Sequence, residues 1–195
     1  RASPTAMVAA FGAAARLGIL VKSTGFLEAA ASVNTIIMDK TGTITTGTFE
    51  VTRLAPAEGV EGADLLKAAA TAERNSNHPL AQSIVRTADK ARVPVEAPAE
   101  FQEIHGKGVR AVTEAGELHV GRSSWLKELR PDQASAIEAI EAKIEGISGV
   151  HVMRDGRYMG VVGLEDRVRT NTKGVLQRLR DLGARHIAIF TGDRL

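Results

Sequence analysis

Two short apolar segments, each ending in a cluster of threonine, glycine and aspartate, constrain the fold of this chain most strongly. The segment "VNTIIM" (residues 33–38) precedes "DKTGT" (39–43), and "HIAIF" (186–190) precedes "TGD" (191–193). The first segment is β-branched and almost continuously apolar, which predicts a short, fully buried strand. Ligands of open α/β sheets bind beyond the carboxyl ends of parallel strands. The sequence therefore predicts an α/β fold in which both strands lie in one sheet and both clusters at one edge.

The residues between the two strands read as an inserted domain with its own helices and small sheet. Residues 63–74 have helical composition, and a second helix is expected to begin at Pro79, since proline is favoured in the first turn. Asp155-Gly156, between two alternating segments, is typical of a β-hairpin. We expect the divisions to be residues 1–27, a helix; 28–52, the first part of the outer domain; 53–163, the insertion; and 164–195, the second part of the outer domain.

Other segments give weaker structural signals. The Gly/Thr-rich stretch 41–48 reads as a polar linker, and 108–121 as two strands around a turn. Residues 132–145 resemble a surface helix, and residues 172–183 a helix with Gly183 at its C-cap.

The overall composition is that of a soluble globular protein. Of 195 residues, 44% are hydrophobic and 25% charged, enough for one large domain or two small ones. Without cysteine there is no disulfide framework and no thiolate metal site, and a reducing cytosol is compatible. The net charge of +2 comes from scattered basic residues with one Tyr and one Trp, which argues against nucleic-acid binding.

The N-terminal segment is the most apolar part of the chain. Arg1 and Arg16 bracket a run that is too short for a membrane span, which needs about 20 apolar residues, and no basic region marks a signal peptide. The segment reads as a buried or amphipathic helix. The alternative is the cytosolic end of a helix whose membrane part lies upstream.

Asp39 is a candidate nucleophile, because a carboxylate at a strand end can attack phosphorus and form an aspartyl phosphate. Phosphoryl transfer needs positive charge and hydrogen-bond donors around the moving group. Lys40, the Thr41 hydroxyl and the amides around Gly42 supply them next to Asp39. The alternative is a solvated turn residue in an ordinary turn.

The second cluster offers matching groups. Thr191 and the amide of Gly192 are candidates to hold the same phosphoryl group, and Asp193 to help with magnesium or orientation. A Walker loop is absent from the sequence, so a nucleotide held in that manner is not expected.

"DKTGT" with the downstream "TGD" resembles the phosphorylation and hinge signatures of P-type ATPases, within the haloacid-dehalogenase-like superfamily. The resemblance implies a partial Rossmann-type phosphorylation domain with an inserted α+β nucleotide-binding domain, an antiparallel sheet flanked by helices. It also implies transfer of the ATP γ-phosphoryl group to Asp39, with Mg²⁺ held through Asp39 and Thr41. Hydrolases of the superfamily typically carry a second aspartate where this chain has Thr41, which favours a pump over a phosphatase.

"AERNSNHPLAQSI" (residues 72–84) resembles the Ser-x-His-Pro-Leu signature of the heavy-metal-transporting, type IB branch. This implies that His78 contacts adenine, that Pro79 fixes its geometry and that Glu73 reaches the base. As a bare dipeptide, His78-Pro79 would instead read as a helix start capped by Ser76 or Asn77.

Further matches extend this resemblance along the inserted domain. "GKG" matches a Gly-x-Gly in which Gly106 and Gly108 let the backbone approach nucleotide phosphates. Many members have a Gly-Asn pair near the ribose. This chain has the glycine, Gly121, but has Arg122 in place of the asparagine.

Asp166 and Arg169 match the family's Asp-x-x-Arg, with a surface ion pair at a helix start as the alternative. The remaining histidines read as surface or strand residues, and no zinc-ligand spacing is visible; they are His105, His119, His151 and His186.

The resemblance implies that this chain is the cytoplasmic part of a longer protein, which is integral to a bacterial inner membrane. Its partners are ATP and the rest of the same polypeptide, and its cycle drives heavy-metal export. The ion, among Zn, Cd, Co and Cu, is not indicated by these residues. The alternatives are a soluble phosphatase of the same superfamily and a non-catalytic nucleotide-binding module.

Overall fold

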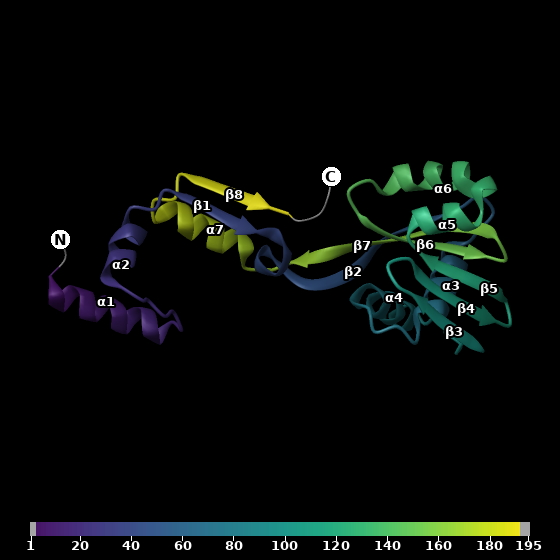
Figure 1. Ribbon diagram of the computed structural model, residues 1–195, viewed down its shortest axis with the longest axis horizontal. Helices are drawn as coiled ribbons and strands as arrows, with labels where there is room; N and C mark the ends of the chain where they lie inside the picture. The colour runs from purple at the N-terminus through teal and green to yellow at the C-terminus, as the bar shows by residue number, and fades with distance from the viewer. Residues whose placement is uncertain (1–2, 192–195) are drawn as a thin grey trace. The chain divides into compact units, whose positions relative to one another are not determined.

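The computed structural model describes residues 3–191 and separates the chain into two compact units (Figure 1). We call Thr46–Arg167 the inserted unit. The split unit consists of the segments before and after it, up to Thr45 and from Val168. Residues 46–52 and 164–167, which we had assigned to the outer domain, thus belong to the inserted unit.

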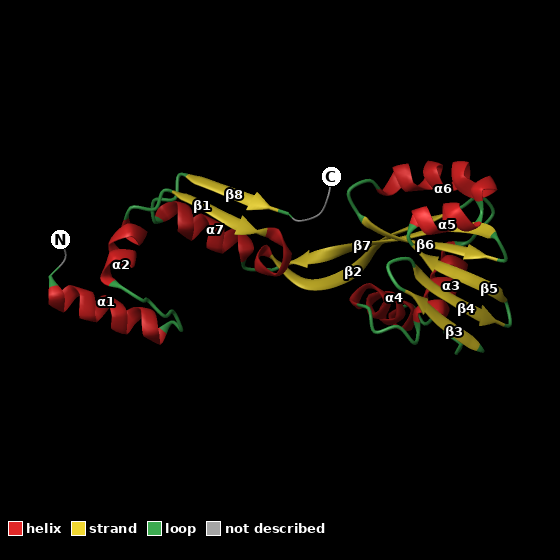
Figure 2. Ribbon diagram, in the orientation of Figure 1, coloured by secondary structure: helices red, strands yellow, loops and turns green. Residues whose placement is uncertain are grey.

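The inserted unit is built on a six-stranded sheet with the strand order β2-β7-β6-β5-β4-β3 (Figure 2). The pairs from β3 through β7 are antiparallel. Positive φ at both Asp155 and Gly156 forms the tight β6–β7 turn, as the sequence predicted. The strands are β2 (Thr45–Pro56), β3 (Glu100–Ile104), β4 (Gly108–Thr113), β5 (Gly116–Gly121), β6 (Ser148–Arg154) and β7 (Arg157–Val168).

Helices α3 (Gly62–Glu73) and α4 (Pro79–Lys90) cover one face of this sheet. Leu65 and Ile84 are fully buried, and four alanines of α3 let the helix lie close to the strands. Helix α3 begins and ends within one residue of the predicted range 63–74, and α4 begins at Pro79 as predicted.

Helices α5 (Ser123–Leu129) and α6 (Ala134–Glu141) form a second core on the other face, around Trp125, Leu126 and Ile137. The surface helix expected over residues 132–145 is interrupted. Short 3₁₀ turns at Pro131–Gln133 and Ala142–Ile144 flank α6, whose Ile137 and Ile140 are buried. Because both faces are covered, β7 is buried from Tyr158 to Leu164.

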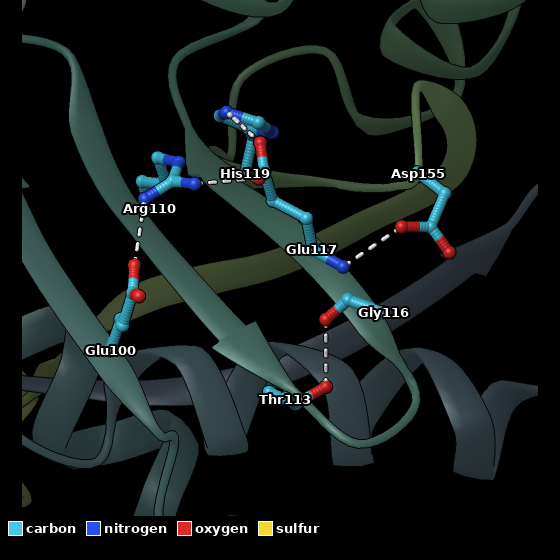
Figure 3. A network of polar contacts seen from close by, with 7 residues as sticks. All are labelled: Glu100, Arg110, Thr113, Gly116, Glu117, His119 and Asp155. Atoms are coloured by element: carbon cyan, nitrogen blue, oxygen red, sulfur yellow. Dashed lines mark hydrogen bonds and ion pairs between the residues drawn. The ribbon is translucent and has the colours of Figure 1, made fainter.

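Strands β3, β4 and β5 also carry a polar network (Figure 3). Arg110 pairs with Glu117 at 2.7 Å and with Glu100 at 3.5 Å, and Asp155 accepts a hydrogen bond from the Glu117 amide. The Arg110 hydrogen bond is the main cause that lowers the pKa of Glu117. The network uses the strand positions that alternate with the apolar residues facing α3, so it stabilises the opposite face of the sheet.

The split unit contains a parallel pair of strands, β1 (Thr35–Asp39) and β8 (His186–Phe190). The two strands are thus neighbours in one sheet, as predicted. The prediction of a fully buried first strand was wrong, since the side chains of β1 alternate between exposed and half-buried and Ile37 is 64% exposed. Within the described residues, β1 has only β8 as a strand partner.

Helices α1 (Pro4–Arg16), α2 (Thr24–Ala31) and α7 (Thr172–Asp181) complete the split unit, and none of their residues is buried. The predicted polar linker over residues 41–48 was wrong, because Lys40–Ile44 forms an irregular helical turn and β2 begins at Thr45. Within residues 3–191, no helix combines the length and apolarity needed to cross a membrane.

Candidate functional site

Asp39 is the last residue of β1, and its side chain is exposed. The carboxylate accepts a hydrogen bond from the Thr41 amide at 3.3 Å, and Asp39 caps the turn that follows. In the parallel register Asp39 lies opposite Phe190, so Thr191 follows directly at the same edge of the sheet. The structure thus brings the first residues of both sequence clusters to one strand end. Gly192 and Asp193 lie outside the described residues.

Arg169, just before α7, and Thr172, at the start of α7, hold the loop that follows Asp39. The Arg169 side chain donates from Nε to the Thr45 carbonyl and from Nη2 to the Gly42 carbonyl, both at 3.1 Å. The Thr172 hydroxyl and the Arg169 amide both donate to the Ile44 carbonyl. Arg169 therefore acts as a brace for the loop that carries Lys40 and Thr41, a role that sequence spacing did not reveal.

The inserted unit contains a separate hollow of about 250 Å³. It lies where the end of α3 and the start of α4 meet the ends of β3, β4 and β5, next to β6. Among its lining residues are six that we predicted to bind nucleotide: Glu73, His78, Gly106, Gly108, Gly121 and Arg122. The remaining predicted residue, Pro79, is the first residue of α4 and is not part of the lining.

His78 is itself the N-cap of α4, so the alternative of a cap at Ser76 or Asn77 was wrong. Its Nδ1 accepts a hydrogen bond from the Leu80 amide at 3.2 Å. A neutral imidazole that accepts at Nδ1 carries its hydrogen on Nε2. His78 is therefore held with a donor available to a ligand, while its own amide donates to the Ser76 hydroxyl.

Glu73 is the buried acid of the hollow, with an exposed fraction of 7%. Burial raises its pKa to about 7, with a further contribution from nearby Glu103, while a hydrogen bond from Ser76 opposes the shift. At neutral pH the carboxyl can therefore be either protonated or ionised. It can accept from an amino group when ionised and donate when protonated.

Sequence reasoning missed Glu103 because β3 was not predicted as a strand. Its residues, "EFQEI", include three polar ones, and only Phe101 and Ile104 are half-buried. The edge strand is defined by its pairing with β4, which no local signal shows.

Gly108 and Gly121 are paired across β4 and β5, and the two strands approach each other closely there. A Cβ on either residue would lie 2.7 Å from the Cα of the other, and one on Gly108 would collide with the Val120 carbonyl. The strand pairing therefore requires both glycines whether or not a ligand binds. Gly106 differs, since its φ of +72° favours glycine while the space around it is open.

The donors around Asp39 suit magnesium held together with a phosphate. Mg²⁺ usually keeps several waters and binds through one or two carboxylates plus phosphate oxygens, so a single carboxylate with Thr41 beside it fits. Within residues 3–191, no group of three or more carboxylate, histidine or cysteine side chains forms a metal site by itself.

A family model, haloacid dehalogenase-like hydrolase, matches residues 33–195. The chain is also 36% identical to a probable copper-exporting P-type ATPase of Archaeoglobus fulgidus, over 98% of this chain and 23% of that protein. It is 35% identical to a cadmium, zinc and cobalt-transporting ATPase of Bacillus subtilis, over 97% of this chain and 26% of that protein. The chain thus spans about a quarter of the length of these curated relatives.

Among solved structures, a zinc-transporting PIB-type ATPase in its E2.Pi state matches with a TM-score of 0.78 and 32% identity, over 98% of this chain and 31% of that one. The catalytic domain of a CPx-ATPase matches with a TM-score of 0.65 and 28% identity, over 90% and 60% of the two chains. These matches confirm the predicted fold class and the resemblance to heavy-metal P-type ATPases.

Proposed function

Because this chain belongs to the haloacid dehalogenase-like hydrolase family, we propose that it is the ATP-binding and phosphorylation region of a heavy-metal-exporting P-type ATPase. The observation that supports this most is the parallel β1–β8 pair, which brings an exposed aspartate and Thr191 to one strand end. The similarity to copper-exporting and to cadmium, zinc and cobalt-transporting ATPases supports the same class of function.

In the proposed reaction, a carboxylate oxygen of Asp39 attacks the γ-phosphorus of ATP. A phosphorus–oxygen bond forms, the bond to the bridging oxygen breaks, and ADP leaves with that electron pair. The transferred phosphoryl group is held by Lys40, Thr41, Thr191 and Gly192. Asp193 helps with magnesium or with the orientation of that group. Mg²⁺, held through Asp39 and Thr41, neutralises charge on the phosphates when bound.

The hollow of the inserted unit is proposed to bind adenine. Glu73 faces the exocyclic amine, and His78, positioned by Pro79 and by its own hydrogen bond to Leu80, contacts the ring. Gly106 leaves open space beside the bound nucleotide, while Gly108 and Gly121 let β4 and β5 approach each other closely at the wall of the hollow.

As part of a longer polypeptide, the region would be the cytoplasmic portion of an integral protein of a bacterial inner membrane. The exposed apolar side chains of β1 and β8 are suited to contact the rest of that polypeptide. Residues other than those proposed here determine which ion is transported, whether Zn, Cd, Co or Cu.

The test is acid-stable labelling from γ-labelled ATP, carried out in membranes that contain the longer polypeptide and across a panel of metal ions. We expect labelling that depends on one soft metal ion and is abolished by Asp39→Asn. Asp181→Asn, an exposed aspartate of α7, is the matched control and should label normally. Metal-independent labelling with release of phosphate from small phosphomonoesters would favour a phosphatase, and no labelling in the wild type would reject the proposed transfer.

A further inference from the structure

Only two side chains that line the adenine hollow are cationic, Lys107 and Arg122. Its carboxylates are Glu73 and Glu103, which come from the end of α3 and from β3. A nucleotide carries a neutral base and an anionic phosphate chain, so this separation of charge favours one orientation of the ligand. The base belongs beside the carboxylates and the phosphates beside the two cations.

The two cations arise from adjacent backbone. The Arg122 amide donates to the Lys107 carbonyl at 2.9 Å, at the place where β4 and β5 approach each other closely. Lys107 is already engaged, since its Nζ lies 2.7 Å from Glu128 Oε2. The Arg122 side chain is exposed and, within the part of the chain that the structure describes, makes no ion pair.

From this geometry we infer that Arg122 binds the phosphate chain of the nucleotide and fixes the direction in which it leaves the hollow. The inference rests on the proposed nucleotide site and adds the residue that distinguishes a nucleotide from a nucleoside. The guanidinium presents several N–H donors in a planar fork that matches phosphate oxygens, and it stays charged at every physiological pH.

Arg122 also lines a second, larger hollow of about 700 Å³, between α5, α6 and the start of β6. Its other ionisable side chains are Glu138, Glu141, Glu145 and His151. Lys127 pairs with Glu138 at 3.4 Å and with Glu141 at 3.2 Å, and His151 is neutral because burial lowers its pKa to about 4. Among the residues that line this hollow, Arg122 is therefore the one cationic side chain, and Glu145 adds a negative charge. The adenine hollow instead has both Arg122 and Lys107 in its lining, so we expect the phosphate chain there.

The test measures binding of adenosine, AMP and ATP to the 195-residue chain by calorimetry, with Arg122→Asn as the variant. We expect Arg122→Asn to weaken ATP binding roughly tenfold or more, because the charge-assisted hydrogen bonds to the phosphates are lost. Adenosine affinity should be unchanged. Added salt should weaken ATP binding to the wild type more than to Arg122→Asn, because salt screens the charge contact.

Three further variants complete the design. Arg122→Lys should keep part of the ATP affinity, and Lys107→Asn should lose less than Arg122→Asn, because Glu128 already neutralises Lys107. Arg157→Asn removes an equal charge from an exposed position at the start of β7 and should bind like the wild type.

The outcomes separate this inference from the proposed function. If the wild type binds ATP but Arg122→Asn behaves like Arg157→Asn, or loses adenosine and ATP equally, the inference is wrong while the nucleotide site stands. A larger loss in Lys107→Asn would assign the contact to that residue and overturn the role of Arg122. If the folded wild type binds none of the three ligands, the proposed nucleotide site fails first, and the inference falls with it.

Discussion

The inserted unit and the split unit are stabilised in different ways. The inserted unit buries apolar side chains on both faces of its sheet, in two separate cores. In the split unit, Ile37 and Phe190 are 64% and 61% exposed, and none of the residues described in α1, α2 and α7 is buried. Its order comes from the β1–β8 pairing and from polar bonds such as those of Arg169. The proposed nucleotide hollow is thus supported by two buried cores, and the proposed nucleophile mainly by polar bonds.

The largest expected difference is in hydrogen exchange. Amides of β5, β6 and β7 should exchange at least 1,000-fold more slowly than those of β1 and β8. Core strands open with free energies near the global value, whereas a two-stranded sheet with exposed faces is marginal. Exchange followed by mass spectrometry on the 195-residue chain measures this. Equal protection in both sheets would show that the split unit has a stable core of its own.

A matched pair of truncations sharpens the comparison. Leu65→Ala in α3 removes a fully buried side chain and should lower the free energy of unfolding by about 2–5 kcal/mol. Ile37→Ala in β1 should cost less than about 1 kcal/mol, because most of that side chain is already in contact with water. Denaturant unfolding followed by circular dichroism measures both variants. Equal costs would contradict the difference in burial.

How far the sequence predicts each unit follows from the same physical difference. The Asp155-Gly156 hairpin and the Pro79 helix start depend on local backbone preferences, and both were predicted correctly. The exposure of β1 depends on how many layers cover it, which the residues of one strand cannot show. The segment "VNTIIM" (residues 33–38) therefore looked fully buried, although the side chains of β1 alternate between exposed and half-buried.

The candidate sites show the same limit. Asp39, Glu73 and His78 are candidates because sequence motifs mark them. Glu103 approaches Glu73 through a β3 strand that has no clear pattern of its own, and Arg169 reaches the loop carbonyls through tertiary contacts. A residue that contacts backbone or side chains far away in the sequence leaves no periodic pattern. The residues that position a site are therefore harder to predict than those at its centre.

Glu73 gives the inserted unit a stability that depends on pH. Its pKa is about 7 in the folded state against an ordinary value of 4.5, so the folded state binds the proton more tightly. The stability from this carboxyl is complete below pH 4.5 and is lost as the pH rises through 7. Glu73→Gln should therefore raise the free energy of unfolding at pH 8, by up to about 3 kcal/mol.

Thermal unfolding of wild type and Glu73→Gln at pH 5 and pH 8 tests this, with Glu58→Gln as an exposed control in the same unit. The gain at pH 8 should be much larger than at pH 5. His151 acts in the opposite direction at lower pH, since burial lowers its pKa to about 4, and it is common to both proteins. A stability gap that does not change with pH would contradict the raised pKa of Glu73.

The most local effect is expected at Arg169, where the split unit depends on polar bonds. Arg169→Ala removes two side-chain hydrogen bonds to the Gly42 and Thr45 carbonyls. Each such bond contributes about 0.5–1.5 kcal/mol, so the loop should lose about 1–3 kcal/mol of local stability. Faster exchange at residues 41–45, with unchanged exchange in β5 to β7, is the expected result. Arg178→Ala in α7 is the control, because no side-chain bond joins it to this loop within residues 3–191. Unchanged exchange at residues 41–45 would show that the β1–β8 pairing and the bonds to the Ile44 carbonyl hold the loop after Asp39 without the Arg169 side chain.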